Sequence, residues 1–263
     1  MNSNMESRAR FERVFKVEKP IIAMIHLGDP KRDLTSSNAQ DLVFSNAQIE
    51  IQTFYELGAT AVLVENYFGS ARDVERTLDW LRRVCPERIY GVNILGDVRR
   101  AFELAQKYGA SFVQADSVCG HLEPERDVAF SDKLLNLRSE YEDVLLLGGV
   151  RFKYQPVRSG RSLEEDLEHG IRRCDAIVVT GEGTGMATED DKIRRFREII
   201  GDFPLIVGAG VTDRNCARQL SIADGAIIGS FFKKDGIAAN CVEPSRVRAI
   251  MNVVDFVRKN VQR

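Results

Sequence analysis

Eight short runs of almost continuously apolar, often β-branched residues constrain the fold of this sequence more than any other feature. Strands that pair in parallel are buried on both faces, so they appear as continuous apolar runs rather than as an alternation of apolar and polar residues. The runs span residues 20–26, 60–66, 89–95, 111–116, 143–149, 175–181, 203–210 and 225–230. We interpret all eight as buried parallel strands.

Segments with helical periodicity lie between these runs, for example residues 41–58, 97–109 and 214–222, and several end in glycine as helices commonly do. Strands that alternate with helices at a repeat of roughly 30 residues predict a (β/α)₈ TIM barrel, with a doubly wound open sheet as the alternative. No linker divides the chain, so we predict one domain over residues 1–263, in which residues 1–18 form a helical cap under the barrel and residues 244–261 the last helix.

The composition excludes several classes of protein. With 44% hydrophobic and 29% charged residues in 263, the chain can bury a sizeable core. The net charge of −2 argues against nucleic acid and polybasic membrane partners, and no apolar run approaches the roughly 20 residues that span a bilayer. The five cysteines are scattered without a CxxC pair, which favours a reduced, cytoplasmic protein without a zinc knuckle. Homo-oligomerisation stays open.

Polar residues follow nearly every predicted strand, at the end where barrels of this kind carry their active sites. As catalytic candidates we take residues capable of acid–base or charge-stabilising chemistry: His26, Glu65, Asp116 and Lys153. As candidates for substrate binding we take Asn66, Asn93, Arg151, Thr180, Glu182, Thr184, Gly208, Gly210, Gly229 and Ser230. A metal ion held by His26, Glu65, Asp116 and Glu182 can be imagined, but the spacing does not favour it and we predict none. The sequence does not identify a cofactor.

The glycines after the last two strands carry the most specific signal. Gly208 and Gly210 follow the seventh strand, and Gly229 with Ser230 follows the eighth. In TIM barrels these two loops and a short helix after strand 8 often hold a phosphate, because glycine lets the backbone N–H groups approach an anion. The alternative is that the glycines only permit tight turns. Their paired occurrence favours a phosphate site, to which Lys233 and Lys234 could add charge.

The loops after strands 5 and 6 also contain candidates. In the basic loop 151–161, alternation would point Arg151 and Lys153 the same way, so both could contact an anionic group. The glycine-rich loop 180–191 matches no nucleotide-binding motif. It is equally consistent with a segment that closes over a ligand, with Thr180, Glu182 and Thr184 inside, and with a plain flexible loop.

Motifs along almost the whole chain resemble the BtpA family, which includes a photosystem I biogenesis factor and sugar-operon proteins. They read IHLGDP from residue 25, GATAVLVENYFG from 58, GVNIL from 91, IVVTGEGTG from 177, VGAGVTDRN from 207 and ADGAIIGSFFKKDG from 223. The resemblance implies a barrel with a phosphate-type site at strands 7 and 8. By position it supports His26, Glu65, Asn66, Asn93, Thr180, Thr184, Gly185, Gly208, Gly210, Gly229 and Lys233.

The chain departs from the family pattern at strands 3, 4 and 5, where 95-LGDV-98, 114-QAD-116 and 148-GGVRFKY-154 replace LRND, RVN and ADVHVKH. The expected function is an enzyme that acts on a small phosphorylated metabolite, a phosphosugar or a phosphoribosyl or nucleoside-type compound. Isomerase, lyase and glycosidic-bond-cleaving activities all remain open. The alternative is a non-catalytic assembly or regulatory factor of the photosystem I biogenesis type.

Overall fold

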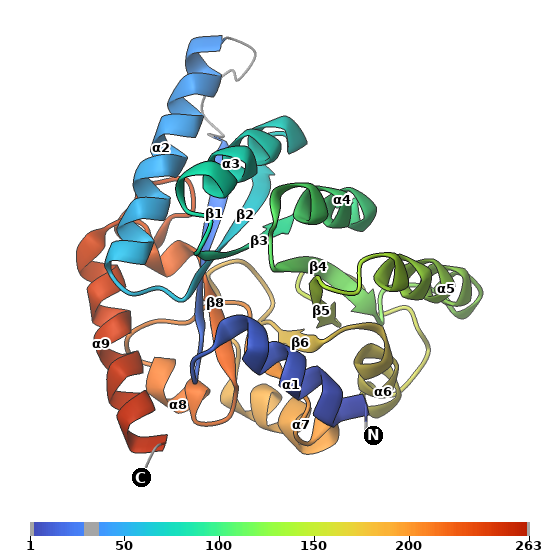
Figure 1. Cartoon of the computed structure of the whole chain (residues 1–263). Helices are drawn as coiled ribbons and strands as arrows, with labels where there is room; N and C mark the ends of the chain where they lie inside the picture. Colours follow the sequence, from blue (N-terminus) through green and yellow to red (C-terminus); the bar gives the residue numbers. More distant parts are fainter. Residues whose placement is uncertain (1–2, 29–36, 262–263) are drawn as a thin grey trace.

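Eight parallel strands close into a barrel in the computed structural model, which describes residues 3–28 and 37–261 (Figure 1). Each strand pairs with the next along the chain, and β8 closes the barrel on β1. The strands are β1 (Ile21–Gly28), β2 (Ala61–Phe68), β3 (Ile89–Asn93), β4 (Phe112–Cys119), β5 (Leu145–Val150), β6 (Ala176–Val179), β7 (Leu205–Val207) and β8 (Gly225–Ile228). The predicted TIM barrel is therefore confirmed.

Helices surround the barrel and connect its strands (Figure 1). They are α1 (Ser3–Phe15), α2 (Ser37–Glu56), α3 (Ala71–Val84), α4 (Val98–Tyr108), α5 (Pro124–Glu140), α6 (Leu163–Arg173), α7 (Asp190–Ile200), α8 (Cys216–Leu220) and α9 (Pro244–Val261), with 3₁₀ turns η1 (Ser230–Phe232) and η2 (Lys234–Gly236) after β8. Their ends follow local sequence: Ser70 and Asp73 form a capping box before α3, and Gly109 ends α4 in the left-handed conformation.

Two apolar layers hold the barrel together. The larger one lies between the strands and the outer helices. The smaller one fills the barrel interior, and α1 contributes Phe11 and Phe15 to it from below. The Phe15 ring lies 5.4 Å from that of Phe112 on β4, so α1 covers the floor of the barrel. Burying an aromatic side chain of this size contributes about 2–3 kcal/mol.

The sequence motif at the end of β1 lies only partly within the described residues. The motif that begins with Ile25 continues to Asp29 and Pro30, which lie outside the described residues. In the part of the chain that is described, no helix combines the length and the apolar character that crossing a membrane requires.

Candidate active site

A layer of polar side chains lies at the carboxyl ends of the first four strands. The strand register places His26 beside Glu65, and Glu65 beside Asn93. The amide nitrogen of Asn93 donates to Glu65 Oε1 at 2.7 Å and to Asp116 Oδ1 at 3.1 Å. On β4, Gln114 follows the Val92–Val113 pair in register and its Nε2 is 3.5 Å from Asp116 Oδ1. One amide thus joins two carboxyl groups at the mouth of the barrel.

Burial raises the pKa of both carboxyl groups. The pKa of Glu65 is raised from 4.5 to about 8, chiefly by burial and also by the charge of Asp116, against the opposing effects of Lys153 and Asn93. Burial also raises the pKa of Asp116, against the hydrogen bond from Asn93 and the charge of Lys153. Glu65 is only 4% exposed, whereas Asp116 is partly exposed. The pair can therefore supply both an acid and a base.

His26 is a neutral imidazole in this environment. Its pKa is lowered to about 3, chiefly by burial and also by the positive charges of Lys233 and Lys153. Its Nε2 is 3.8 Å from Glu65 Oε2, and its ring meets that of Tyr67 edge-on at 4.8 Å. Among the described residues, buried Nδ1 has no hydrogen-bond partner. His26 can therefore form hydrogen bonds as a neutral group, but it is a weak base and carries no positive charge at neutral pH.

A cavity of about 180 Å³ adjoins this layer on the side of β7 and β8. His26 and Lys153 line it on one side, and Gly210, Gly229 and Ser230 line it on the other. Glu65 and Asp116 do not line this cavity. His26 and Lys153 line the cavity, and His26 Nε2 also lies 3.8 Å from Glu65 Oε2. The charge of Lys153 acts on both carboxyl groups.

Crowding by protein atoms accounts for the glycines of this cavity without any ligand. A Cβ on Gly229 would lie 2.6 Å from Cε1 of His26, so glycine lets the imidazole lie against the backbone of β8. Gly210 has φ +65°, and its Cβ would lie 2.2 Å from the carbonyl oxygen of Met186. Gly208 similarly faces Val178. The glycine pattern alone therefore does not distinguish a phosphate site from tight packing.

Lys153 takes its place through an irregular backbone after β5. Arg151 has φ 47° and Tyr154 has φ 62°, both in the left-handed region that side chains rarely adopt. The backbone N–H of Lys153 donates to Thr180 Oγ1 at 2.9 Å, so this buried threonine holds the lysine backbone. Within the described residues Lys153 forms no ion pair, which leaves its charge available to a ligand.

Two tyrosines hold the loop after β6 across the mouth. The Tyr67 hydroxyl lies 3.3 Å from Thr184 Oγ1, and the backbone N–H of Thr184 donates to the Tyr154 hydroxyl at 2.7 Å. Thr184 and Gly185 line the cavity, so this loop closes one side of it. Neither tyrosine was a sequence candidate, because a tyrosine next to a strand end gives no pattern that separates it from a packing residue.

Like Glu65 and Asp116, the sequence candidates Arg151, Glu182 and Asn66 do not line the cavity. The left-handed backbone at Arg151 breaks the alternation that would have pointed it toward Lys153, and its guanidinium bonds Asp166 at 2.8 Å instead. Glu182 is exposed and lines a separate surface depression. Asn66 uses its side-chain oxygen to accept from the backbone N–H of Leu95 at 2.9 Å.

The expected contribution of Lys233 to an anion site is also not seen. Lys233 is buried, and its ammonium lies 2.5 Å from Glu50 Oε1 on α2. The pair borders a separate cavity of about 60 Å³ between β1, α2 and the segment after η2. The expected short helix after strand 8 is the single 3₁₀ turn η1, too short to supply a sizeable dipole.

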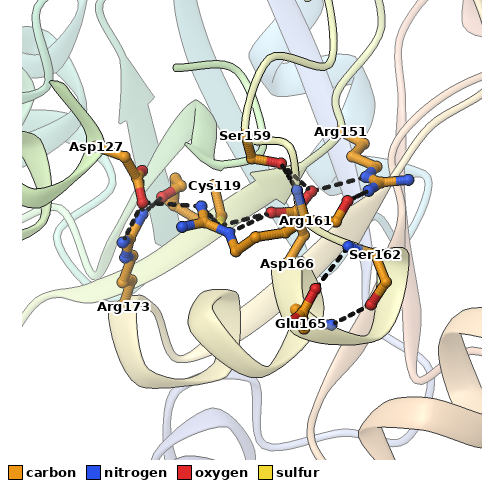
Figure 2. Close-up of polar contacts among 10 residues, drawn as sticks. Cys119, Asp127, Arg151, Ser159, Arg161, Ser162, Glu165, Asp166 and Arg173 are labelled. Atoms are coloured by element: carbon orange, nitrogen blue, oxygen red, sulfur yellow. Dashed lines mark hydrogen bonds and ion pairs between the residues drawn. The ribbon is translucent and has the colours of Figure 1, made fainter. Parts of the chain in front are cut away.

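Arg151 belongs to a buried ionic network between β4, α5 and α6 (Figure 2). Asp166 accepts from Arg151, Arg161 and Ser159 at 2.8 to 2.9 Å. Arg161 and Arg173 also bind Asp127. Cys119 lies within the network, and burial raises the pKa of its thiol to about 11. The network anchors the loop after β5 and so supports the backbone that presents Lys153.

The described side chains do not provide the donor set that a metal ion requires. Among residues 3–28 and 37–261, no three His, Cys, Asp or Glu side chains are arranged to hold a metal ion. The carboxyl groups of the mouth are instead joined by the Asn93 amide. The protein is therefore a (β/α)₈ barrel with buried carboxyl and imidazole groups beside a cavity at the carboxyl ends of its strands.

The chain belongs to the BtpA family, whose model matches residues 83–256. A protein of Methanocaldococcus jannaschii is 28% identical over 92% of this chain and 97% of its own length. The putative sgc region protein SgcQ of Escherichia coli is 27% identical over 94% and 98% of the two chains. The photosystem I biogenesis protein BtpA of Synechocystis is 22% identical over 92% and 90%.

Solved structures with the same fold are more distant in sequence. The 3-hexulose-6-phosphate synthase of Salmonella typhimurium superposes with a TM-score of 0.62, at 12% identity, over 90% of this chain and 99% of its own. Phosphoribosyl anthranilate isomerase of Thermus thermophilus superposes with a TM-score of 0.57, at 11% identity, over 91% and 100%. At such identities the likeness shows the barrel fold alone.

Proposed function

We propose that this protein is an enzyme that acts on a small phosphorylated metabolite, a phosphosugar or a phosphoribosyl or nucleoside-type compound. The observation that carries the proposal is the junction of two regions at Lys153. On one side lies the cavity at the ends of β7 and β8, and on the other lies the carboxyl pair Glu65 and Asp116. A ligand that spans the junction would bring its phosphate to the cavity and its reacting end to the carboxyl groups.

The acid–base roles follow from the electrostatics. Glu65 holds its proton at neutral pH because it is buried beside Asp116, so it acts as the general acid. Asp116 is more exposed and accepts a proton from the ligand. Lys153 stabilises negative charge that develops on a substrate oxygen. Isomerisation, elimination and glycosidic cleavage can all use an acid, a base and a positive charge placed in this way.

The names of the relatives and structural neighbours agree with the proposal in part. Several neighbours carry phosphorylated compounds in their names, among them a thiamine phosphate pyrophosphorylase with a TM-score of 0.58. The name of the Synechocystis relative supports the second candidate, an assembly factor without catalytic activity. A scaffold has no need of a carboxyl pair held in an unfavourable buried environment, so we favour the enzyme.

The test follows the reaction without assuming which one it is. The full chain is incubated in D₂O with pentose and hexose phosphates, and ³¹P and ¹H NMR record new signals or loss of C–H signals to deuterium. We expect turnover or exchange with at least one compound, and its loss in Glu65→Gln and Asp116→Asn. An enzyme of this kind is ruled out if no compound reacts and calorimetry detects no binding of inorganic phosphate or of any sugar phosphate.

A further inference from the structure

Hydrogen bonding in the polar layer of the mouth is unbalanced, because among the described residues one buried acceptor has no protein donor. Asn93 donates from its amide nitrogen to both Glu65 and Asp116. Gln114 directs its amide nitrogen at Asp116. The second carboxyl oxygen of Glu65 lies 3.8 Å from His26 Nε2, which is too long for a hydrogen bond. The amide nitrogens of the layer are thus directed at the two carboxyl groups, and among the described residues a buried amide oxygen is left without a donor.

Gln114 shows this imbalance most clearly. Its side chain is 4% exposed, and among the described residues its Oε1 has no hydrogen-bond partner. Along β4 it faces the same side as Phe112, whose ring is in the barrel interior, and as Asp116 at the mouth. A buried carbonyl oxygen without a donor costs about 1–3 kcal/mol. A ligand that donates to it recovers that cost.

The positive charge around the layer limits which kind of ligand group can donate to Gln114 Oε1. The positive charges of Lys153 and Lys233 both act on His26, and Lys153 also acts on Glu65 and Asp116. An ammonium group would meet these like charges. A hydroxyl group is neutral, donates one hydrogen bond and can accept another.

We propose that the ligand presents adjacent hydroxyl groups to this layer and that one of them donates to Gln114 Oε1. The proposal rests on the proposed function and makes its substrate class narrower: a phosphorylated polyhydroxy compound, such as a sugar or polyol phosphate, with its carbon chain toward Glu65 and Asp116. Gln114 is then a specificity-determining residue of the site. The sequence candidates did not include it.

The experiment compares probes with the same charged group and different hydroxyl content. Isothermal titration of the full chain measures Kd for inorganic phosphate, phenyl phosphate and a set of pentose, hexose and polyol phosphates. We expect the best polyhydroxy phosphate to bind at least about 10-fold tighter than phenyl phosphate. Gln114→Met should weaken that ligand about 10-fold, because it removes a buried acceptor, and leave Kd for inorganic phosphate unchanged.

Gln219 supplies a matched control on α8. It too is buried, and within the described part of the chain its Oε1 has no hydrogen-bond partner, while its Nε2 donates to the carbonyl oxygen of Thr188. It lies outside the polar layer, so Gln219→Met should change neither affinity. Gln114→Asn, which withdraws the acceptor by about one bond length, provides a second variant with a polar side chain if the methionine variant does not fold.

The outcomes separate this proposal from the proposed function. If Gln114→Met and Gln114→Asn both keep the full affinity for polyhydroxy phosphates, or if phenyl phosphate binds equally well, the hydroxyl proposal is wrong. If no phosphate compound binds, the phosphate part of the proposed function is wrong. Binding of an unphosphorylated polyol at millimolar concentration, weakened in Gln114→Met, would then still support the hydroxyl contact.

Discussion

Replacing Glu65 by glutamine should stabilise the protein, and increasingly so as the pH rises. The folded state raises the pKa of Glu65 from 4.5 to about 8, so the native protein holds this proton more tightly than the unfolded chain does. The stability that the protonated Glu65 contributes is therefore fully present below pH 4.5 and is lost as the pH rises toward 8. Glutamine does not ionise, and its side-chain oxygen can still accept from Asn93.

The size of the effect follows from the interval between the two pKa values. Each pH unit in that interval lowers the free energy of unfolding of the wild type by about 1.4 kcal/mol. The wild type should lose about 4 kcal/mol relative to Glu65→Gln between pH 5 and pH 8. Glu65 is almost completely buried, so solvent screening does not reduce this figure much. For a domain of marginal stability this is a large fraction of the total.

Urea unfolding of both proteins at pH 5 and pH 8 measures the difference. Glu75→Gln is a suitable control, because hydrogen bonds from Lys107 and Tyr108 lower the pKa of Glu75 and leave it ionised throughout this range. Its effect on stability should be the same at both pH values. If the difference between wild type and Glu65→Gln is also independent of pH, the buried-acid interpretation of Glu65 is refuted.

Three further substitutions test other parts of the site. Ser230→Asp should weaken binding of inorganic phosphate at least about 10-fold in calorimetry by placing a like charge in the cavity; unchanged binding would place phosphate elsewhere. Gly229→Ala should displace the His26 ring and cost about 1–3 kcal/mol, so unchanged His26 NMR signals and unfolding midpoint would contradict the close approach. Lys233→Met should cost about 3–5 kcal/mol by leaving Glu50 unpaired, and adding Glu50→Leu should restore much of it; equal urea midpoints for wild type and single variant would contradict a buried pair.

The barrel and the positions of its strand ends could be predicted from the sequence. Parallel strands inside a ring of helices are apolar on both faces, so they can be recognised in the sequence without knowing how they pair. His26, Glu65 and Asn93 then had to lie near one another, because neighbouring parallel strands end at the same edge. Asp116 joins them from the next strand in the barrel.

The directions of side chains in the loops could not be predicted. Alternation holds only while the backbone stays extended, and the left-handed φ at Arg151 turns its side chain to Asp166 while Lys153 faces the cavity. The burial of Lys233 depends on Glu50, which lies on α2 and far away in sequence. Gln114 gave no signal because a single glutamine within an apolar strand does not reveal which of its atoms lacks a partner.

The contrast between the two polar regions of the molecule supports a ligand at the mouth. In the network around Asp127 and Asp166, each acid binds at least two arginines, and this pairing lowers the pKa of both carboxyl groups. That region is explained by its own internal contacts. At the mouth, burial disfavours the charged forms of His26, Glu65 and Asp116. Gln114 Oε1 there has no hydrogen-bond partner among the residues that the structure describes. Apolar side chains would fill this layer at lower cost, as they do just below it, so the polar layer is better explained by what it binds than by what it stabilises.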